Sequence, residues 1–189
     1  GDGKYFWSGG TRKLWEFASK KKDYDYYVWL NDDSILFKNA FSIIYNDIKK
    51  KSSSIIVGAF ISSNQNLNEL TYGGRDKQLS LLTPSGKPQE CVFINGNFVF
   101  IPKEIFKKVG FLSKMFTHNY GDTDYGLRAI KKNFKIFIAS EIVGVCNKNE
   151  LELWRKPNTK FFARLKSFYK SKNYNIKEVV YFQLVHFGL

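Results

Sequence analysis

Cysteine, histidine and methionine are scarce in this chain of 189 residues, which has two Cys, two His and one Met. Cys91 and Cys146 do not have the spacing of a zinc site. We expect a reduced, intracellular protein, with one disulfide between them as the alternative. No uninterrupted apolar run approaches the roughly 20 residues that a membrane-spanning helix requires. The first segment, GDGKYFWSGG, also differs from a secretory signal, which places an apolar segment after a basic one.

Acidic residues are few as well. The 17 Asp and Glu are outnumbered by 30 Lys and Arg, which gives a net charge of +13 and implies an anionic partner such as nucleic acid, phospholipid or a phosphorylated substrate. The excess is greatest in residues 148–189. Aromatic residues are abundant, with 18 Phe, 11 Tyr and 4 Trp, and they exclude a disordered chain. We expect one domain and assign Trp7 and Trp15 to its core.

Helical and extended segments alternate along the chain. Apolar residues at helical spacing predict helices, and apolar runs between turn residues predict strands. In the first part of the chain we predict a helix over 11–22 capped by Thr11, then strands over 24–30 and 54–60 with a helix over 41–51 between them. Loops follow over 61–89, and then two short strands that meet at Asn95-Gly96. The rest of the chain is predicted to form a helix over 103–110 closed by Gly110, a helix within 120–133, a strand over 134–139, and two basic amphipathic helices after Pro157. This alternation favours a layered α/β architecture.

Two acidic residues, Asp32 and Asp33, follow Asn31 directly after the apolar strand in YDYYVWLNDDS, residues 24–34. Magnesium and manganese prefer carboxylate oxygens, and one or two protein carboxylates suffice when a diphosphate supplies further oxygens. The alternative is structural, with an Asx-turn at Asn31 and Asp32 and a helix cap at Asp33. The spacing alone leaves both open.

A second acidic pair, Asp122 and Asp124, occurs in GDTDYGLRA, residues 121–129. Asp124 and Arg128 have the i,i+4 spacing of a helical ion pair. Asp122 then remains as a carboxylate at the entrance of a helix, which suits a general base. A helix cap is the structural alternative.

Four segments follow one another in a characteristic order: the NDD segment, a Gly-rich middle loop, NGNFVFIPKEIFKKVGFLS and YGDTDYGLRAIKKNFKIFIASEIVG. Together they resemble the family 2 glycosyltransferases of the GT-A fold. The NDD segment corresponds to the D-x-D motif of that family, and GDTDYGLR is similar to its E-D-x-D-L-x-x-R segment. The resemblance covers residues 24–145. It implies a GT-A-like (Rossmann-like) mixed α/β sheet flanked by helices over residues 1–150. A C-terminal basic helical extension over residues 151–189 follows.

The resemblance also implies an activity. The chain would transfer a sugar, with inversion, from a UDP- or dTDP-sugar to a glycan or lipid-linked acceptor in polysaccharide biosynthesis for the cell envelope. Asp33 would hold a divalent cation, Mn²⁺ or Mg²⁺, that bridges the donor diphosphate. Asn31 or Asp32 would contact the nucleoside or sugar of the donor, and Asp122 would deprotonate the acceptor hydroxyl.

Three departures from the family pattern bear on this expectation. Gly121 stands where the family has the Glu of its E-D pair, and VGVCNKN, residues 143–149, lacks the metal-binding His of some members. No opening strand like VSVIIPTYN is present, so we expect the front of the domain to be missing. A catalytically incomplete glycosyltransferase-like fragment is therefore one alternative. A basic nucleic-acid-binding module is another, but the acidic pairs would repel phosphates and no such motif occurs, so we expect no nucleic-acid partner.

Four further residues are candidates for contact with the acceptor: Gly96, His118, Asp124 and Trp154. Gly96 permits close approach of another group to the backbone, which a hairpin also requires. His118 lies four residues before Asp122. A solvated loop histidine is the alternative for it.

The tail has an amphipathic pattern over residues 158–170. Apolar side chains share one helical face and basic side chains the other: Phe161, Phe162, Leu165, Phe168 and Tyr169 against Lys160, Arg164, Lys166 and Lys170. The helix either packs on its own domain or lies on an anionic membrane, where each basic residue adds about 1 kcal/mol. Together with the resemblance, the second possibility predicts a cytoplasmic protein at the inner face of the cell membrane.

Overall fold

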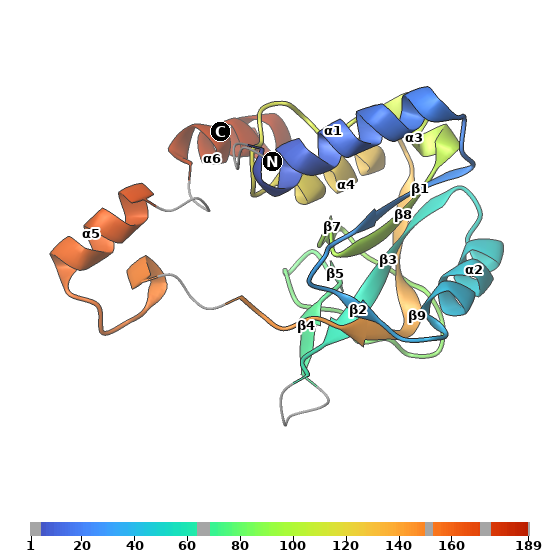
Figure 1. Cartoon of the computed structure of the whole chain (residues 1–189), viewed down its shortest axis with the longest axis horizontal. Coiled ribbons are helices and arrows are strands. Elements are labelled where there is room, and N and C mark those ends of the chain that lie inside the picture. The colour runs from blue at the N-terminus through green and yellow to red at the C-terminus, as the bar shows by residue number, and fades with distance from the viewer. Residues whose placement is uncertain (1–4, 64–68, 150–152, 171–174, 189) are drawn as a thin grey trace.

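The computed structural model describes residues 5–63, 69–149, 153–170 and 175–188 (Figure 1). The helices, in chain order, are α1 (Phe6–Lys21), α2 (Ala40–Lys50), α3 (Lys103–Val109), α4 (Gly121–Lys131), the 3-10 helix η1 (Leu153–Arg155), α5 (Phe161–Lys170) and α6 (Ile176–Phe187). The strands are β1 (Tyr26–Leu30), β2 (Ile35–Leu36), β3 (Ser54–Ile61), β4 (Leu70–Tyr72), β5 (Gly74–Arg75), β6 (Gln89–Glu90), β7 (Phe93–Ile94), β8 (Phe98–Pro102) and β9 (Lys135–Val145).

Most strands form one mixed sheet with the order β1-β8-β3-β9-β2. β3 and β9 run parallel, whereas β8 is antiparallel to both of its neighbours and β2 is antiparallel to β9. β4 pairs with β3 and β6 pairs with β9, while β5 and β7 form a separate two-stranded ribbon. The predicted α/β class, a mixed sheet flanked by helices, is confirmed.

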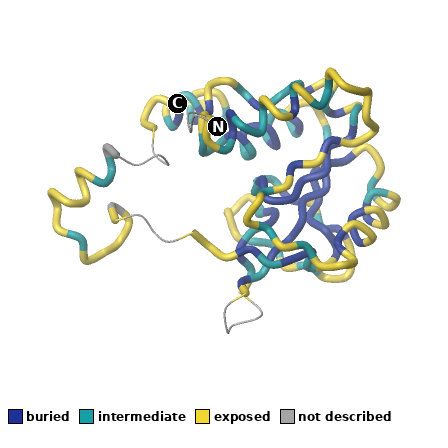
Figure 2. Tube along the Cα trace, in the orientation of Figure 1, coloured by how far each residue is buried: buried dark blue, intermediate teal, exposed yellow. Residues whose placement is uncertain are grey.

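Different helices cover the two faces of the sheet. Successive side chains of a strand point to opposite faces, and along β3 the residues Ile55 and Val57 face one side while Ile56 and Phe60 face the other. The first side packs against α1, α3 and α4, and the second against α2 (Figure 1). All four side chains are fully buried, and Figure 2 shows the sheet as the buried middle layer.

Four strand ends meet at one edge of the sheet. The end of β1 and the start of β8 are joined by the Asn31 N–H, which donates to the Asn97 carbonyl at 3.0 Å. β3 and β9 end together, with Ile61 opposite Val145. Because β8 is antiparallel to β3, the start of β8 also lies beside the end of β3. Segments far apart in the sequence are therefore brought to the same edge, which is where open α/β sheets bind ligands.

Some elements differ from the sequence prediction. α1 begins at Phe6, so Thr11 lies inside the helix and does not cap it. The strands on either side of Asn95-Gly96 do not pair with each other, because β7 pairs with β5 and β8 belongs to the main sheet. Gly110 follows α3 with φ 82°, as expected of a glycine that closes a helix.

The two tail helices differ from each other. α6 packs on the domain through buried Phe182 and Glu178, and its sequence is apolar, so the prediction of a second basic helix is wrong. α5 lies apart from the body of the domain in Figure 1 and leaves Phe161 and Phe162 exposed. Its apolar face is therefore not buried against its own domain. None of the helices in the described ranges combines the length and apolar character that crossing a bilayer would require.

Both cysteines are buried and free, so the disulfide considered above is absent. Burial raises the pKa of the Cys91 thiol to about 12. It also raises the pKa of Cys146, which follows β9 at the edge where the strand ends meet.

Candidate functional site

A cleft of about 360 Å³ opens at this edge of the sheet. Asn31, Asp33, Gly96, His118 and Asp122, all predicted as site residues, line it. They come from separate segments of the sequence, and the strand order brings them together. A groove of similar size, about 350 Å³, runs between α1 and β1, but among the described residues its lining contains no carboxylate or histidine. The cleft, with its carboxylates and His118, is therefore the candidate functional site.

Asn31 and Asp33 lie in the turn between β1 and β2. The Trp7 indole N–H donates to Asn31 Oδ1 at 2.5 Å, so α1 holds the Asn31 side chain. Asp33 is exposed, and the Cys146 thiol lies 3.7 Å from its Oδ1. Asp33 precedes β2, and α2 begins only at Ala40. The alternative that Asp33 caps a helix is therefore wrong, and its carboxylate lies open to the cleft.

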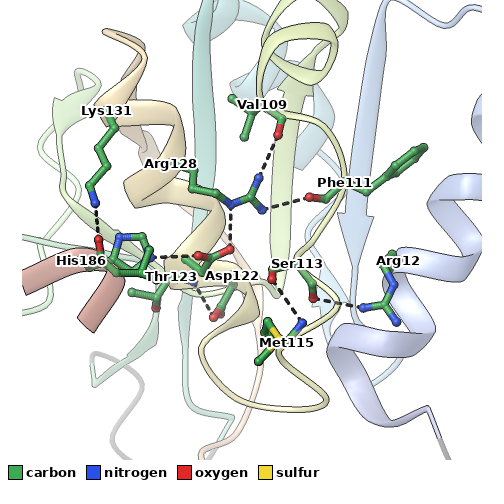
Figure 3. A network of polar contacts seen from close by, with 12 residues as sticks. Arg12, Val109, Phe111, Ser113, Met115, Asp122, Thr123, Arg128, Lys131 and His186 are labelled. Atoms are coloured by element: carbon green, nitrogen blue, oxygen red, sulfur yellow. Dashed lines mark hydrogen bonds and ion pairs between the residues drawn. The ribbon is translucent and has the colours of Figure 1, made fainter. Parts of the chain in front are cut away.

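Asp122 lies in the first turn of α4 (Figure 3). Its Oδ2 accepts a hydrogen bond from the Gly96 N–H at 2.9 Å and its Oδ1 accepts one from the Thr123 N–H at 2.8 Å. Burial raises the pKa of Asp122, and the backbone hydrogen bonds from Thr123 and Gly96 offset part of that rise. A carboxylate with a raised pKa is a stronger base, and two backbone donors fix its orientation.

Gly96 lies against the indole ring of Trp7. A Cβ at Gly96 would be 2.1 Å from Trp7 Cζ2, so no larger residue fits without displacing the ring. The close approach expected of Gly96 is therefore made by a side chain of α1. The backbone N–H of Trp7 donates to His118 Nδ1 at 3.4 Å. Trp7 packs against the core, as predicted, and it also lines the cleft, where it contacts both Asn31 and His118.

Asp124 is not part of the cleft lining. It is 2% exposed, and its Oδ2 pairs with Arg128 Nε at 2.8 Å while its Oδ1 lies 2.9 Å from His186 Nε2 of α6. Arg128 also donates to the carbonyls of Val109 and Phe111, at 2.8 and 2.9 Å. The predicted ion pair between Asp124 and Arg128 is confirmed. Both carboxylate oxygens are therefore occupied within this network, away from the cleft lining.

α6 also holds the segment 113–120, which enters the cleft ahead of α4. Glu178 Oε1 accepts from the Thr117 hydroxyl at 2.7 Å and from its N–H at 3.3 Å. The ring of Phe182 lies 4.7 Å from that of Tyr120. Tyr120 has a left-handed φ of 65°, which costs free energy in a residue with a Cβ. Contacts from α6 therefore stabilise a strained segment of the cleft wall.

Two predicted residues are not brought into the cleft. Asp32 is exposed and does not line it. Trp154 lies in η1, but its side chain is outside the described part of the structure.

The cleft contains residues that the sequence did not single out. Asn95, Asn97 and Asn149 line it, and each amide can both donate and accept hydrogen bonds, as sugar hydroxyls do. The rings of Trp7 and Tyr120 add apolar surface with a polar edge. The N-G-N segment before β8 was a usable signal, but its nearness to β1 depends on strand pairing.

The donor set suits a cation only if a ligand completes its coordination. Within the described residues, no three His, Cys, Asp or Glu side chains are grouped as a metal site would need. Asp33 offers an exposed carboxylate, and magnesium commonly binds one or two carboxylates together with substrate phosphates. The cleft lining contains no Lys or Arg in the described residues. A diphosphate and a hard cation would therefore fit here together better than either alone.

No family model matches the sequence, and no curated protein matches it. Solved structures do resemble the fold. A crystal structure of GalNAc-T7 with UDP, GalNAc and Mn²⁺ has a TM-score of 0.51 and 11% identity, over 93% of this chain and 40% of that one. A crystal structure of A197 from STIV has a TM-score of 0.46 and 12% identity, over 74% and 75% of the two chains. The chain spans well under half of GalNAc-T7, and the likeness supports a GT-A-like fold alone.

Proposed function

We propose that this protein is a metal-assisted, inverting glycosyltransferase that moves a sugar from a nucleotide-diphosphate donor to a glycan or lipid-linked acceptor. The observation that carries the proposal is the cleft itself. It brings two carboxylates, Asp33 and Asp122, together with several amides and aromatic rings at the ligand-binding edge of the sheet. The GT-A-like neighbour GalNAc-T7 was crystallised with UDP, GalNAc and Mn²⁺, which supports the nucleotide-sugar donor and the divalent cation in this proposal. The inverting mechanism, the acceptor and family 2 membership rest on the sequence resemblance.

On the donor side, Asp33 would hold the divalent cation, Mn²⁺ or Mg²⁺, through its exposed carboxylate. Such a cation neutralises the charge that develops on a departing nucleoside diphosphate. Asn31, fixed by the Trp7 indole, would bind the nucleoside or sugar of a UDP- or dTDP-sugar. Without a basic residue in the described lining, the diphosphate depends on that cation.

On the acceptor side, Asp122 would take the proton from the acceptor hydroxyl. The hydroxyl oxygen then bonds to the anomeric carbon as the bond from that carbon to the diphosphate oxygen breaks. Attack from the face opposite the leaving group inverts the configuration. His118, which lines the cleft on the segment before α4, is placed to contact the acceptor.

The donor site is tested by calorimetric titration of UDP and dTDP into the protein with and without manganese. Asp33→Asn should abolish metal-dependent binding, because it removes the cation's protein carboxylate. Asp32→Asn is the matched control, since Asp32 is a neighbouring exposed acid that does not line the cleft. Wild-type affinity in Asp33→Asn would remove Asp33 from this role, and no binding by the wild-type protein would favour an incomplete glycosyltransferase-like fragment.

The base is tested by Asp122→Asn in a sugar-transfer assay. Turnover should fall by about 10²–10⁴-fold, the usual contribution of a general base, with UDP binding retained. The anomeric configuration of the product, read by NMR, tests inversion. Unchanged turnover in Asp122→Asn would leave Asp122 with a structural role at the start of α4.

We place the enzyme in the cytoplasm, at the inner face of a membrane that carries its acceptor. The two free, buried thiols agree with a reducing compartment. Nucleic acid is not the partner we propose, because the cleft presents carboxylates and no cationic side chain among the described residues.

A further inference from the structure

Helix α5 exposes a continuous apolar stripe. Phe161 and Phe162 are 70% and 82% exposed, and Leu165, one turn further on the same face, is 41% exposed. Aromatic side chains of this size are normally buried, and a contiguous exposed apolar patch marks a surface that binds something.

The segment around α5 has charge of one sign. Residues 153–177 contain eight basic residues and no acidic one: Arg155, Lys156, Lys160, Arg164, Lys166, Lys170, Lys172 and Lys177. A second copy that paired its α5 with this one would bring two positive segments together, and such a contact is repulsive. An apolar stripe flanked by Lys and Arg is instead the pattern of a helix that lies in the plane of an anionic bilayer.

Helix α6 provides a second apolar face. Ile176, Val180, Leu184 and Phe187 follow one another at spacings of three and four residues, so they share one face, and each is 49–55% exposed. The opposite face of α6 is the one that contacts the domain through Glu178, Phe182 and His186. α6 is thus held to the cleft wall on one side and leaves apolar side chains outward on the other.

We infer that α5 and the outward face of α6 dock the protein on an anionic lipid bilayer, so that the acceptor reaches the cleft from the membrane surface. The evidence for docking is the exposure of apolar side chains on both helices and the positive charge of the segment around α5. The identification of the acceptor as lipid-linked rests on the proposed function.

The connection to the cleft runs through α6. Glu178 binds Thr117, which precedes the cleft residue His118, and Phe182 stacks beside Tyr120, another cleft residue. The other end of the tail leaves the domain at Asn149, which also lines the cleft. Membrane-bound tail helices would therefore keep the mouth of the cleft near the bilayer.

The test is co-sedimentation of the full chain with vesicles of phosphatidylcholine alone or mixed with phosphatidylglycerol, at low and high salt. We expect binding only to the mixed vesicles, weakened by salt. A triple variant, Lys160→Glu with Arg164→Glu and Lys166→Glu, should lower partitioning by about 100-fold or more, since each charge near such a surface contributes roughly a factor of five. The matched control reverses exposed lysines elsewhere, Lys20, Lys77 and Lys132.

Two serine variants test the apolar contribution. Phe161→Ser with Phe162→Ser on α5, and Val180→Ser with Leu184→Ser on α6, should each weaken vesicle binding by about tenfold. Phe17→Ser with Tyr45→Ser removes exposed aromatic rings from α1 and α2 and should change nothing.

The inference is overturned if the chain ignores anionic vesicles, if it binds neutral and anionic vesicles equally, or if the tail variants bind like their controls. The inference is also overturned if the full chain binds random oligonucleotide through α5 and does not bind vesicles. Formation of dimers that the serine variants disrupt would overturn it as well. Titration of UDP into the tail variants tests donor binding separately from membrane docking. Membrane docking can fail while donor binding persists.

Discussion

At the scale of single residues, the departure at Gly121 has a structural explanation. A Cβ at Gly121 would lie 2.3 Å from Ser8 Oγ, so the start of α1 occupies the space that a side chain here would need. The Ser8 hydroxyl in turn donates to the His118 carbonyl at 2.8 Å. The Glu of the resembling family could not be restored by one substitution, because α1 would have to move.

The carboxyl group of Asp122 should make stability depend on pH. Its pKa in the folded protein is raised above the ordinary value of 3.8, so the folded state binds this proton more tightly than the unfolded chain does. Its contribution to stability is full below pH 3.8 and is lost as the pH rises through the folded pKa. Urea unfolding of wild type and Asp122→Asn across this range should show a fall with pH that the Asn variant lacks. Parallel curves would contradict the burial of this charge.

At the scale of elements, periodicity in the sequence predicts most helices and strands, because each depends on neighbouring residues. Strand partners were not predictable in the same way. Asn97 lies close to Asn31 because β8 inserts between β1 and β3, and no local pattern encodes that order. The contact of His186 with Asp124 likewise joins residues 62 positions apart. The acids of the site could be read from motifs, whereas the amides, Trp7 and the role of α6 required the folded chain.

Removal of the His186 side chain should loosen α6. His186→Ala leaves one oxygen of buried Asp124 without its partner, and we expect a loss of about 1–3 kcal/mol in urea unfolding. Leu184→Ala is the control on the outward face of the same helix, where a change within about 0.5 kcal/mol is expected. Amide exchange over 113–120 should quicken only in His186→Ala. Equal effects of both substitutions would mean that α6 does not hold this segment.

At the scale of the whole molecule, the main sheet separates two buried clusters, and the cleft lies at the edge where the adjacent strands β1, β8, β3 and β9 meet. Ligand binding at such an edge should stabilise the whole domain. The α/β class was expected from the alternation of helices and strands along the sequence, and the structural similarity to GalNAc-T7 agrees with it.

Manganese and UDP together should raise the unfolding temperature. At about 100 times the Kd, binding contributes roughly 2.7 kcal/mol, which for a domain of this size shifts the midpoint by about 5–10 °C. Differential scanning calorimetry would measure the shift, with Asp33→Asn as the variant that should lack it. A shift with UDP alone would show that the diphosphate needs no cation.

The position of α6 in chain order has a consequence for synthesis. All strands of the sheet precede it, so the emerging chain can assemble its core while α5 and α6 are still being made. The strained segment at Tyr120 receives its contacts from α6 only afterwards. A chain that ends before α6 would therefore fold its sheet without the contacts that stabilise this segment of the cleft wall.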